Sequence, residues 1–255
     1  MSSKLRIISL VPSLTETLFD LGLEDSVVGI TKFCVHPVHF KSTKTIVGGT
    51  KNVKIDKVKS LQPDIIIANK EENTLEMVLE LEQICPVWVT EIYTIEDALQ
   101  VILDFGERFQ RRVEAQKWVN KIQQAQQDFE QFLTKIPERT AAYFIWANPY
   151  MVAGSHTYIN SLLAYNKFKN IYADKEVRYP EIVLKRIRLE GDPQLVLLSS
   201  EPFPFKDEHA FEIGRCTHHA KTIFVDGEMF SWYGTRLYKA LGYFKMLQLR
   251  LLEQE

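Results

Sequence analysis

The chain has 255 residues, a length that fits either two small domains or one large one. Hydrophobic residues make up 45% and charged residues 25%, which are the proportions of a globular protein and exclude a disordered chain. The net charge of -2 excludes a strong overall electrostatic attraction of the protein to nucleic acid or to an anionic membrane. No apolar run reaches the ~18 residues that a membrane-spanning helix needs.

The composition also argues against two common kinds of site. With 11 glycines in 255 residues, a glycine-rich loop that cradles phosphate is disfavoured. The three cysteines, Cys34, Cys85 and Cys216, are too few and too far apart for a disulfide framework or a CxxC zinc site.

Short apolar runs alternate with helical patterns along the chain, which indicates an α/β fold. In the first half, strands are predicted at residues 7–11, 27–30, 65–68 and 87–89. Residues 15–21 predict a helix that ends at Gly22. Because Ser13 precedes Glu16 by three residues, the sequence also predicts a capping box at the start of this helix.

One long helical pattern lies near the middle of the chain. Apolar side chains recur every three to five residues from Phe109 to Ile136, and no glycine or proline interrupts them before Pro137. This predicts a helix of roughly 40 Å. A surface helix and a rigid spacer between two lobes both fit the pattern. Because segments of lobe size lie on either side of it, we favour the spacer.

The two halves of the chain are weak repeats of each other. Each contains a short helix, a turn with proline, an aliphatic strand and a glutamate, in that order. These features lie at 57–71 in the first half and at 186–201 in the second. The strands that follow also correspond, 87–90 with 223–226. Together with the long helix, the repeat predicts two α/β lobes joined by one rod.

In open α/β sheets, ligands bind beside the carboxyl ends of the strands. The loops at these positions are 12–15, 32–37, 69–73 and 91–94 in the first lobe, and 146–158, 199–205 and 227–235 in the second. The loops of the second lobe carry eight aromatic residues: Trp146, Tyr150, Tyr158, Phe203, Phe205, Phe230, Trp232 and Tyr233. Aromatic loops favour a large, flat and partly apolar ligand over a sugar phosphate.

Three motifs follow one another along the chain. The first is Ile8–Glu16, ISLVPSLTE; the second is Val47–Gly49, VGG, with Leu61–Ala68, LQPDIIIA; the third is Ser231–Arg236, SWYGTR. In this order they resemble the helical-backbone, or class III, substrate-binding proteins of ABC importers, which bind cobalamin or ferric siderophores. The third motif is similar to the cobalamin-binding branch of that family.

The resemblance implies two Rossmann-like α/β lobes, at 1–106 and 138–255, joined by a single long helix at 107–137, with a ligand cleft between the lobes. It implies a metal chelate (a corrinoid, a ferric siderophore or haem) that is transported and is not a prosthetic group, and ABC permease subunits as partners. The candidate ligand-binding residues are Ser13, Cys34, His36, Trp146, Tyr150, His156, Tyr158, Phe203 and Trp232.

Members of that family dock onto arginines of the permease through a glutamate on each lobe. The matching positions are Glu71 or Glu72 in the first lobe and Glu201 or Glu208 in the second. Carboxylates on both lobes would fix the orientation of docking through charge-assisted hydrogen bonds. The alternative is that these are solvated loop charges, as most surface glutamates are.

The resemblance also implies a periplasmic or cell-surface protein. The residues before Ile7 contain no apolar h-region and no cleavage site of a leader peptide. Two interpretations follow: a leader was removed, or the chain is a cytoplasmic relative that binds a corrinoid or a bare metal ion without docking to a permease.

A metal-binding role is a further hypothesis. Cys34 and His36 lie two residues apart in a predicted cleft loop, and His156 lies in a loop of the other lobe. These side chains could hold one metal ion or supply an axial ligand to cobalt or iron. The alternative, which we favour, is a partly buried cysteine beside a capping or solvent-exposed histidine.

An enzyme is the least favoured function. The sequence contains no GxSxG, GxxxxGK[ST], GxGxxG or HExxH motif. Cys34 and His36 would need a third group to orient them as a nucleophile pair, and none can be identified.

Overall fold

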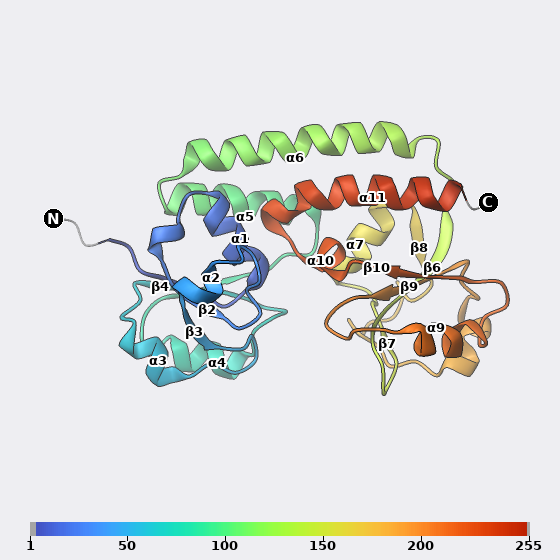
Figure 1. Ribbon diagram of the computed structural model, residues 1–255, viewed down its shortest axis with the longest axis horizontal. Coiled ribbons are helices and arrows are strands. Elements are labelled where there is room, and N and C mark those ends of the chain that lie inside the picture. Colours follow the sequence, from blue (N-terminus) through green and yellow to red (C-terminus); the bar gives the residue numbers. More distant parts are fainter. Residues whose placement is uncertain (1–3, 254–255) are drawn as a thin grey trace. The chain divides into compact units, whose positions relative to one another are not determined.

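The computed structural model describes residues 4–253, which form two compact α/β units (Figure 1). The first unit contains the chain up to Ile92, then Glu96–Gln124 and Tyr233–Tyr238. The second contains Tyr93–Ile95, Ala125–Trp232 and the chain from Lys239 onward.

The first unit contains a five-stranded parallel sheet in the order β3-β2-β1-β4-β5. Its strands are β1 (Ile7–Ser9), β2 (Val27–Thr31), β3 (Thr45–Gly48), β4 (Ile65–Asn69) and β5 (Val87–Thr90). The four strands predicted from the sequence are confirmed, although the first ends at Ser9. Because all five strands are parallel, their carboxyl ends meet at one edge of the sheet.

The helices of the first unit are α1 (Pro12–Asp20), η1 (Glu24–Ser26), α2 (Phe40–Thr43), α3 (Ile55–Ser60), α4 (Leu75–Leu81), α5 (Ile95–Arg108), the first part of α6 (Arg112–Leu133) and η3 (Gly234–Arg236). Helix α1 begins three residues earlier than predicted, with Pro12 in its first turn and Val11 as its N-cap. The predicted capping box is therefore wrong, since Ser13 already lies inside the helix and no side chain caps it.

Helix α6 is the long helix predicted near mid-chain. It begins at Arg112 instead of Phe109, because the chain turns sharply after α5 through Gln110, whose φ is +57°. At this turn a Cβ on Gly106 would lie 2.4 Å from Ala115 Cβ, so only glycine permits the approach of the two helices. Helix α6 passes from the first unit into the second between Gln124 and Ala125. The predicted architecture of two α/β units joined by one long helix is thus confirmed.

The second unit contains a sheet in the order β10-β9-β6-β7, with β8 also paired to β6. Its strands are β6 (Arg139–Trp146), β7 (Met151–Val152), β8 (Phe168–Asn170), β9 (Leu195–Ser199) and β10 (Lys221–Val225). Strands β8, β9 and β10 run parallel to their neighbours, whereas β7 is antiparallel to β6. The helices are the rest of α6, α7 (Tyr158–Tyr165), η2 (Leu184–Arg186), α8 (Ile187–Glu190), α9 (Asp207–Gly214), α10 (Gly227–Ser231) and most of α11 (Leu237–Leu252).

The repeat predicted between the two halves is visible in the sheets. The neighbouring strands β1, β4 and β5 correspond to β6, β9 and β10. The turns before β4 and β9 also match, because a residue with positive φ precedes a proline in each. These residues are Gln62, with φ of 44°, and Asp192, with φ of 39°.

Each unit includes a short segment from the other half of the sequence. In the second unit, Arg178 Nη2 donates a 2.6 Å hydrogen bond to Tyr93 Oη. In the first unit, Arg236 Nε donates a 2.7 Å hydrogen bond to Glu16 Oε2, and both side chains are buried. The predicted lobe boundaries at residues 106 and 138 stay a prediction. Residues 93–95 belong to the second compact unit and residues 233–238 to the first.

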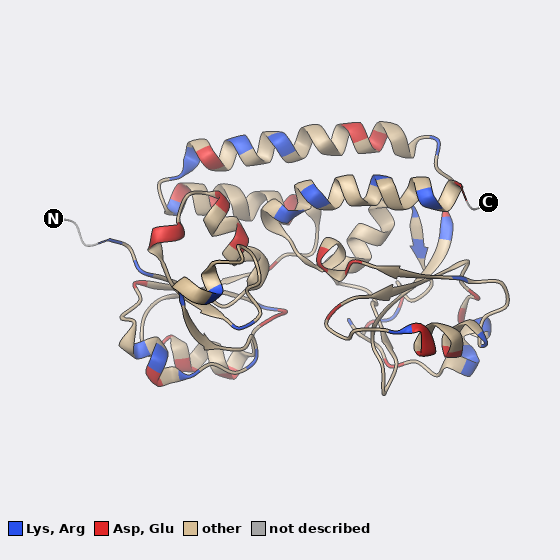
Figure 2. Ribbon diagram, in the orientation of Figure 1, with Lys and Arg blue, Asp and Glu red and all other residues tan. Residues whose placement is uncertain are grey.

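Aliphatic side chains of each sheet form a buried core, one around Ile8 and Ile66 and the other around Val196 and Leu198. In the second unit, Phe129 of α6 packs on Phe244 of α11, with ring centroids 6.3 Å apart. The charged residues of α11 are Lys239, Lys245 and Arg250, all basic (Figure 2). Among the helices of residues 4–253, none combines the length and hydropathy required to cross a bilayer.

Candidate functional site

At the carboxyl edge of the first sheet, the loop after β2 exposes an aromatic ring. Phe33 is 49% exposed, and the Lys32 ammonium lies 4.9 Å from the centre of its ring. Gly49, in the loop after β3, lies against the same ring. This edge therefore presents a half-exposed phenyl ring with a positive charge over it.

Cys34, in the same loop, is fully buried. Its Sγ lies 3.2 Å from Thr15 Oγ1 and 3.4 Å from Thr31 Oγ1. Burial raises the pKa of this thiol. Its hydrogen bonds with the two threonines lower the pKa, by less than burial raises it. His36 is partly buried in the loop that continues from Cys34. Cys34 is thus more deeply buried than the partly buried cysteine of the alternative interpretation.

His156, the third candidate metal ligand, is exposed in the second unit with φ of 53°. Within residues 4–253, no group of three or more His, Cys, Asp or Glu side chains could hold a metal ion. A metal role for Cys34, His36 and His156 stays a prediction. Ser13, another candidate ligand-binding residue, is buried in α1.

The loop after β4 holds Glu71 in a turn that Asn69 stabilises. Asn69 Oδ1 accepts a 2.9 Å hydrogen bond from Glu71 N, and Asn69 Nδ2 donates to Thr90 O and Oγ1, both at 3.1 Å. Asn69 N in turn donates to Asn73 Oδ1 at 2.8 Å. The side chains of Glu71 and Glu72 are both partly exposed.

The loop after β9 repeats this turn. Glu201 N donates to Ser199 Oγ at 3.4 Å, as Glu71 N does to Asn69. Ser200 N donates to Val225 O at 3.0 Å, as Lys70 N does to Thr90 O. Glu71 and Glu201 are therefore structural equivalents, as the repeat in the sequence predicted.

The side chain of Glu201 binds two residues of the third sequence motif. Glu201 Oε1 accepts a 2.8 Å hydrogen bond from Trp232 Nε1 and a 3.0 Å hydrogen bond from Ser231 Oγ. Burial raises the pKa of this carboxyl, the Ser231 hydrogen bond lowers it, and the charge of Glu228 raises it further. Trp232 itself is only 7% exposed.

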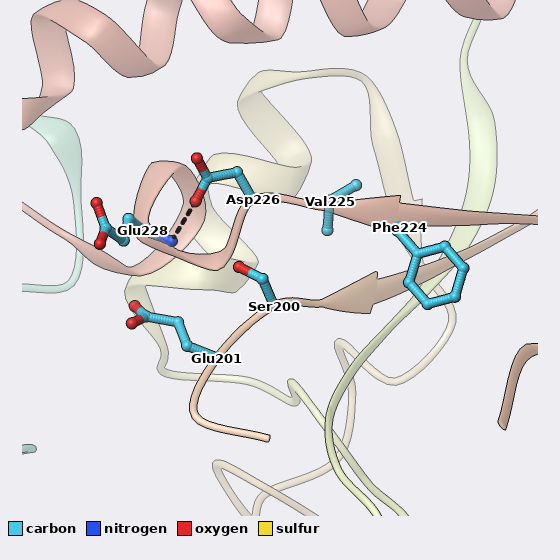
Figure 3. Close-up of a pocket in the computed structure, with 6 residues that line it drawn as sticks. All are labelled: Ser200, Glu201, Phe224, Val225, Asp226 and Glu228. Carbon is cyan, nitrogen blue, oxygen red and sulfur yellow. Dashed lines mark hydrogen bonds between the residues drawn. The ribbon is translucent and has the colours of Figure 1, made fainter. Parts of the chain in front are cut away.

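An open pocket of about 590 Å³ lies at the carboxyl ends of β9 and β10 (Figure 3). Its lining residues are Ser200, Glu201, Phe224, Val225, Asp226 and Glu228. Figure 3 shows the three carboxylates beyond the ends of the two strands, with Asp226 Oδ1 accepting a 3.0 Å hydrogen bond from Glu228 N. The pocket therefore combines an exposed phenyl ring with negative charge.

Of the other aromatic candidates of the second unit, two pack on each other, one is buried and one is hydrogen-bonded to a glutamate. Trp146 is 40% exposed and packs edge-on against Phe203, with centroids 5.5 Å apart, so these two come together. Tyr158 is buried at 2% exposure, and Tyr150 Oη donates to Glu212 Oε2 at 2.6 Å. Glu208, the remaining docking candidate, is exposed in the first turn of α9.

A family model described as periplasmic binding protein matches residues 7–213. The chain belongs to the periplasmic binding protein family. It is 27% identical, over 178 residues, to an uncharacterized ABC transporter substrate-binding lipoprotein of Bacillus subtilis. That alignment covers 67% of this chain and 56% of the lipoprotein, so the chain spans little more than half the length of this relative.

The chain is 25% identical, over 211 residues, to a vitamin B12-binding protein of Vibrio cholerae; the alignment covers 82% of this chain and 72% of that protein. The fold matches two solved structures, each with a TM-score of 0.83. One is the periplasmic vitamin B12 binding protein of Vibrio cholerae, at 20% identity and covering 98% of both chains. The other is a periplasmic heme-binding protein of Roseiflexus, at 17% identity and covering 96% of this chain and 97% of the other.

The residues predicted from the sequence to bind ligand do not include two exposed aromatic residues of this periplasmic binding protein. These are Phe33 and Phe224, at the carboxyl edges of the first and second sheets. Phe33 lies in a loop that the sequence had already singled out, so its position after β2 was a usable signal. Phe224 lies in an aliphatic strand and is 48% exposed because β10 is an edge strand. The sequence pattern of such a strand predicts a core residue.

Proposed function

We propose that this periplasmic binding protein captures a metal chelate and delivers it to an ABC importer. The chelate is either a planar macrocycle (a corrinoid or haem) or a ferric siderophore. The observation that carries the proposal is the family match over residues 7–213. Relatives named for vitamin B12 and haem support the ligand class. Families of this kind bind and deliver ligands, which also disfavours the enzyme hypothesis.

The proposed ligand contacts are the exposed rings at the carboxyl edges of the sheets. In the second unit, Trp146 is 40% exposed and packs edge-on against the partly buried Phe203. In the first unit, Phe33 with the Lys32 ammonium offers an apolar face and a partner for an acidic substituent of the ligand. Burial of such aromatic rings against a macrocycle, and their stacking on it, make the free energy of ligand binding more favourable.

The proposed permease contacts are Glu71 or Glu72 in the first unit and Glu201 or Glu208 in the second. The support is the equivalence of the turns that hold Glu71 and Glu201. Two carboxylates held in equivalent backbone turns could each pair with an arginine through charge-assisted hydrogen bonds, which are stronger than neutral ones.

Ligand binding is tested by titrating the full chain with cyanocobalamin, haemin and a ferric siderophore while tryptophan emission is followed. We expect micromolar or tighter binding of one of them. In the Trp146→Ala variant, affinity should fall about tenfold, which is ~1.4 kcal/mol. Trp88→Phe is the matched control, because Trp88 packs on Phe105 in the first unit. If all three chelates fail to bind at micromolar concentration, the proposed function is wrong.

The alternative of a cytoplasmic relative is disfavoured because the relatives are periplasmic proteins and a lipoprotein. Delivery is tested separately, by uptake of the bound chelate in cells that express this chain together with an ABC importer of that chelate. Glu71→Ala combined with Glu201→Gln should abolish uptake and leave affinity for the chelate within twofold. A loss of affinity would place these glutamates at the ligand instead.

A further inference from the structure

The side chain of His209 holds the end of the loop that carries Phe203. His209 is the third residue of α9, and its Nδ1 accepts a 3.0 Å hydrogen bond from the backbone N of Lys206, the N-cap. In a capping box, a glutamate or glutamine accepts from this same position. Phe205 N donates to Phe203 O at 3.0 Å, so the segment between Phe203 and the helix is a tight turn that ends at the residue bound by His209.

The imidazole ring of His209 also packs on two phenylalanines. Its centroid lies 5.2 Å from that of Phe203 and 5.6 Å from that of Phe205, and it is nearly perpendicular to both rings. Phe205 is buried in the core of the second unit, whereas Phe203 packs edge-on against the exposed Trp146. Phe203 thus contacts both His209 and Trp146, so a movement of the imidazole reaches Trp146 through a single ring.

The hydrogen bond from Lys206 determines where His209 carries its proton. A backbone N–H can only donate, so Nδ1 has no proton and the neutral ring carries its proton on Nε2. A second proton would place an N–H at both nitrogens, and the imidazolium could not accept from Lys206 N in any orientation. Two donors would then face each other across 3.0 Å, so the ring has to turn away. Histidine is the side chain whose charge ordinarily changes between pH 5 and 8.

The charged groups near this ring act in opposite directions. The N-terminal end of α9 is partially positive and opposes a second proton, whereas carboxylates favour it. The charged or titratable residues are Lys206, Asp207, Glu208 and Glu212 on α9 and its N-cap, Glu201 in the preceding loop, and Tyr150, which donates to Glu212. Burial and the bond to Glu212 raise the pKa of Tyr150 above its ordinary value of 10, so this phenol stays protonated between pH 5 and 8. A variant that keeps all of these groups and lacks only the imidazole therefore isolates the effect of His209.

We propose that His209 is a positioning residue for Phe203, and that a second proton on its ring disrupts the packing of Phe203 against Trp146. The proposal rests on the proposed function in one respect, because it takes Phe203 and Trp146 to be ligand contacts. A chelate that stacks on this pair then binds the chain with neutral His209 more tightly, and its binding disfavours the second proton by the same factor. Acid therefore lowers the affinity for the ligand.

The test uses the full chain labelled with ¹⁵N, in which the indole N–H signals of the four tryptophans are followed from pH 5 to 8. The Trp146→Phe variant identifies the signal of Trp146, whose chemical shift depends on the aromatic ring beside it. We expect this signal to move in one titration step. His209→Gln keeps an acceptor for Lys206 N and gains no charge, so the signal should stay level in that variant. His39→Gln, in the first unit, is the matched control and should leave the titration intact.

The consequence for the ligand is measured with cyanocobalamin over the same pH range. Between pH 7.5 and 5.5, the affinity of the native chain should fall about two- to tenfold, the ratio set by one net hydrogen bond. The affinity of His209→Gln should stay constant, because its capping acceptor does not titrate in this range.

Three results would overturn the proposal: a Trp146 signal that does not titrate in the native chain, the same titration in His209→Gln, or a cyanocobalamin affinity of the native chain that is constant between pH 7.5 and 5.5. The Trp146 titration is recorded without ligand. A chain that fails to bind any chelate overturns the proposed function and can still show this titration, so the two failures are distinguishable.

Discussion

The loops after β4 and β9 hold equivalent glutamates in the same backbone turn by different means. In the first, Asn69 and Asn73 bind each other and the neighbouring strand, and Asn73 Nδ2 also donates to Thr50 O at 2.7 Å. In the second, Ser199 replaces Asn69, and the position of Asn73 is taken by Phe203, which packs on the core of that unit. There the glutamate side chain itself binds, through Trp232 and Ser231.

This difference separates two ways of presenting a carboxylate. The loop around Glu71 is stabilised by amide side chains other than the glutamate, so its shape does not need the Glu71 carboxylate. The loop around Glu201 depends in part on that carboxylate. A partner that binds Glu201 therefore competes with internal contacts, and the two loops should respond differently to substitution.

The largest expected effect is that of Asn69→Ala. Asn69 is 1% exposed, and its replacement removes the acceptor of Glu71 N and the amide that donates to Thr90 O and Oγ1, at a buried position. We expect the free energy of unfolding to fall by about 2–3 kcal/mol, measured by urea unfolding. A loss below about 1 kcal/mol would mean that the loop around Glu71 does not depend on the Asn69 side chain.

A smaller effect is expected at the glutamates themselves. Glu201→Ala leaves Trp232 Nε1 and Ser231 Oγ without this acceptor, so the free energy of unfolding should fall by about 1–2 kcal/mol. Glu71→Ala should change it by less than about 0.5 kcal/mol, as at most surface positions. Indole N–H exchange of Trp232 should speed up only in Glu201→Ala. If Glu71→Ala lowered the free energy of unfolding more than Glu201→Ala does, the distinction between the two loops would be wrong.

Much of this arrangement could be predicted from local patterns. The aliphatic runs of β4 and β9, each preceded by a proline turn and followed by a glutamate, fixed the two strands and the equivalence of Glu71 and Glu201. The long apolar pattern predicted α6, because a helical period over some twenty residues is a strong signal.

The failures concern contacts between distant parts of the sequence. The spacing of Ser13 and Glu16 indicated a capping box, but Glu16 pairs with Arg236, 220 residues away. The role of Trp232 at the ligand stays a prediction, and the hydrogen bond of its indole to Glu201, in a loop 31 residues away, was not predicted. Sequence spacing carries no information on such pairs, since they depend on how the sheets bring separate loops together.

The smallest expected effect is a difference in pH dependence. Burial raises the pKa of Glu201 above its ordinary value of 4.5, so between 4.5 and the raised value the folded chain binds more protons at this site than the unfolded chain does. Because stability falls with pH wherever the folded state binds more protons, this residue contributes a loss of stability as pH rises through that window.

Glu201→Gln removes this contribution. The free energy of unfolding of the native chain minus that of Glu201→Gln should therefore decrease as pH rises from 4.5 toward neutrality, by about 1 kcal/mol or less, and should be level below pH 4. Urea unfolding of both chains across this range measures the difference. An increase with pH would mean that the donors Trp232 and Ser231 outweigh burial. The carboxylate would then be held in its charged form by the protein itself, and the second loop would resist a competing cation more strongly than the first.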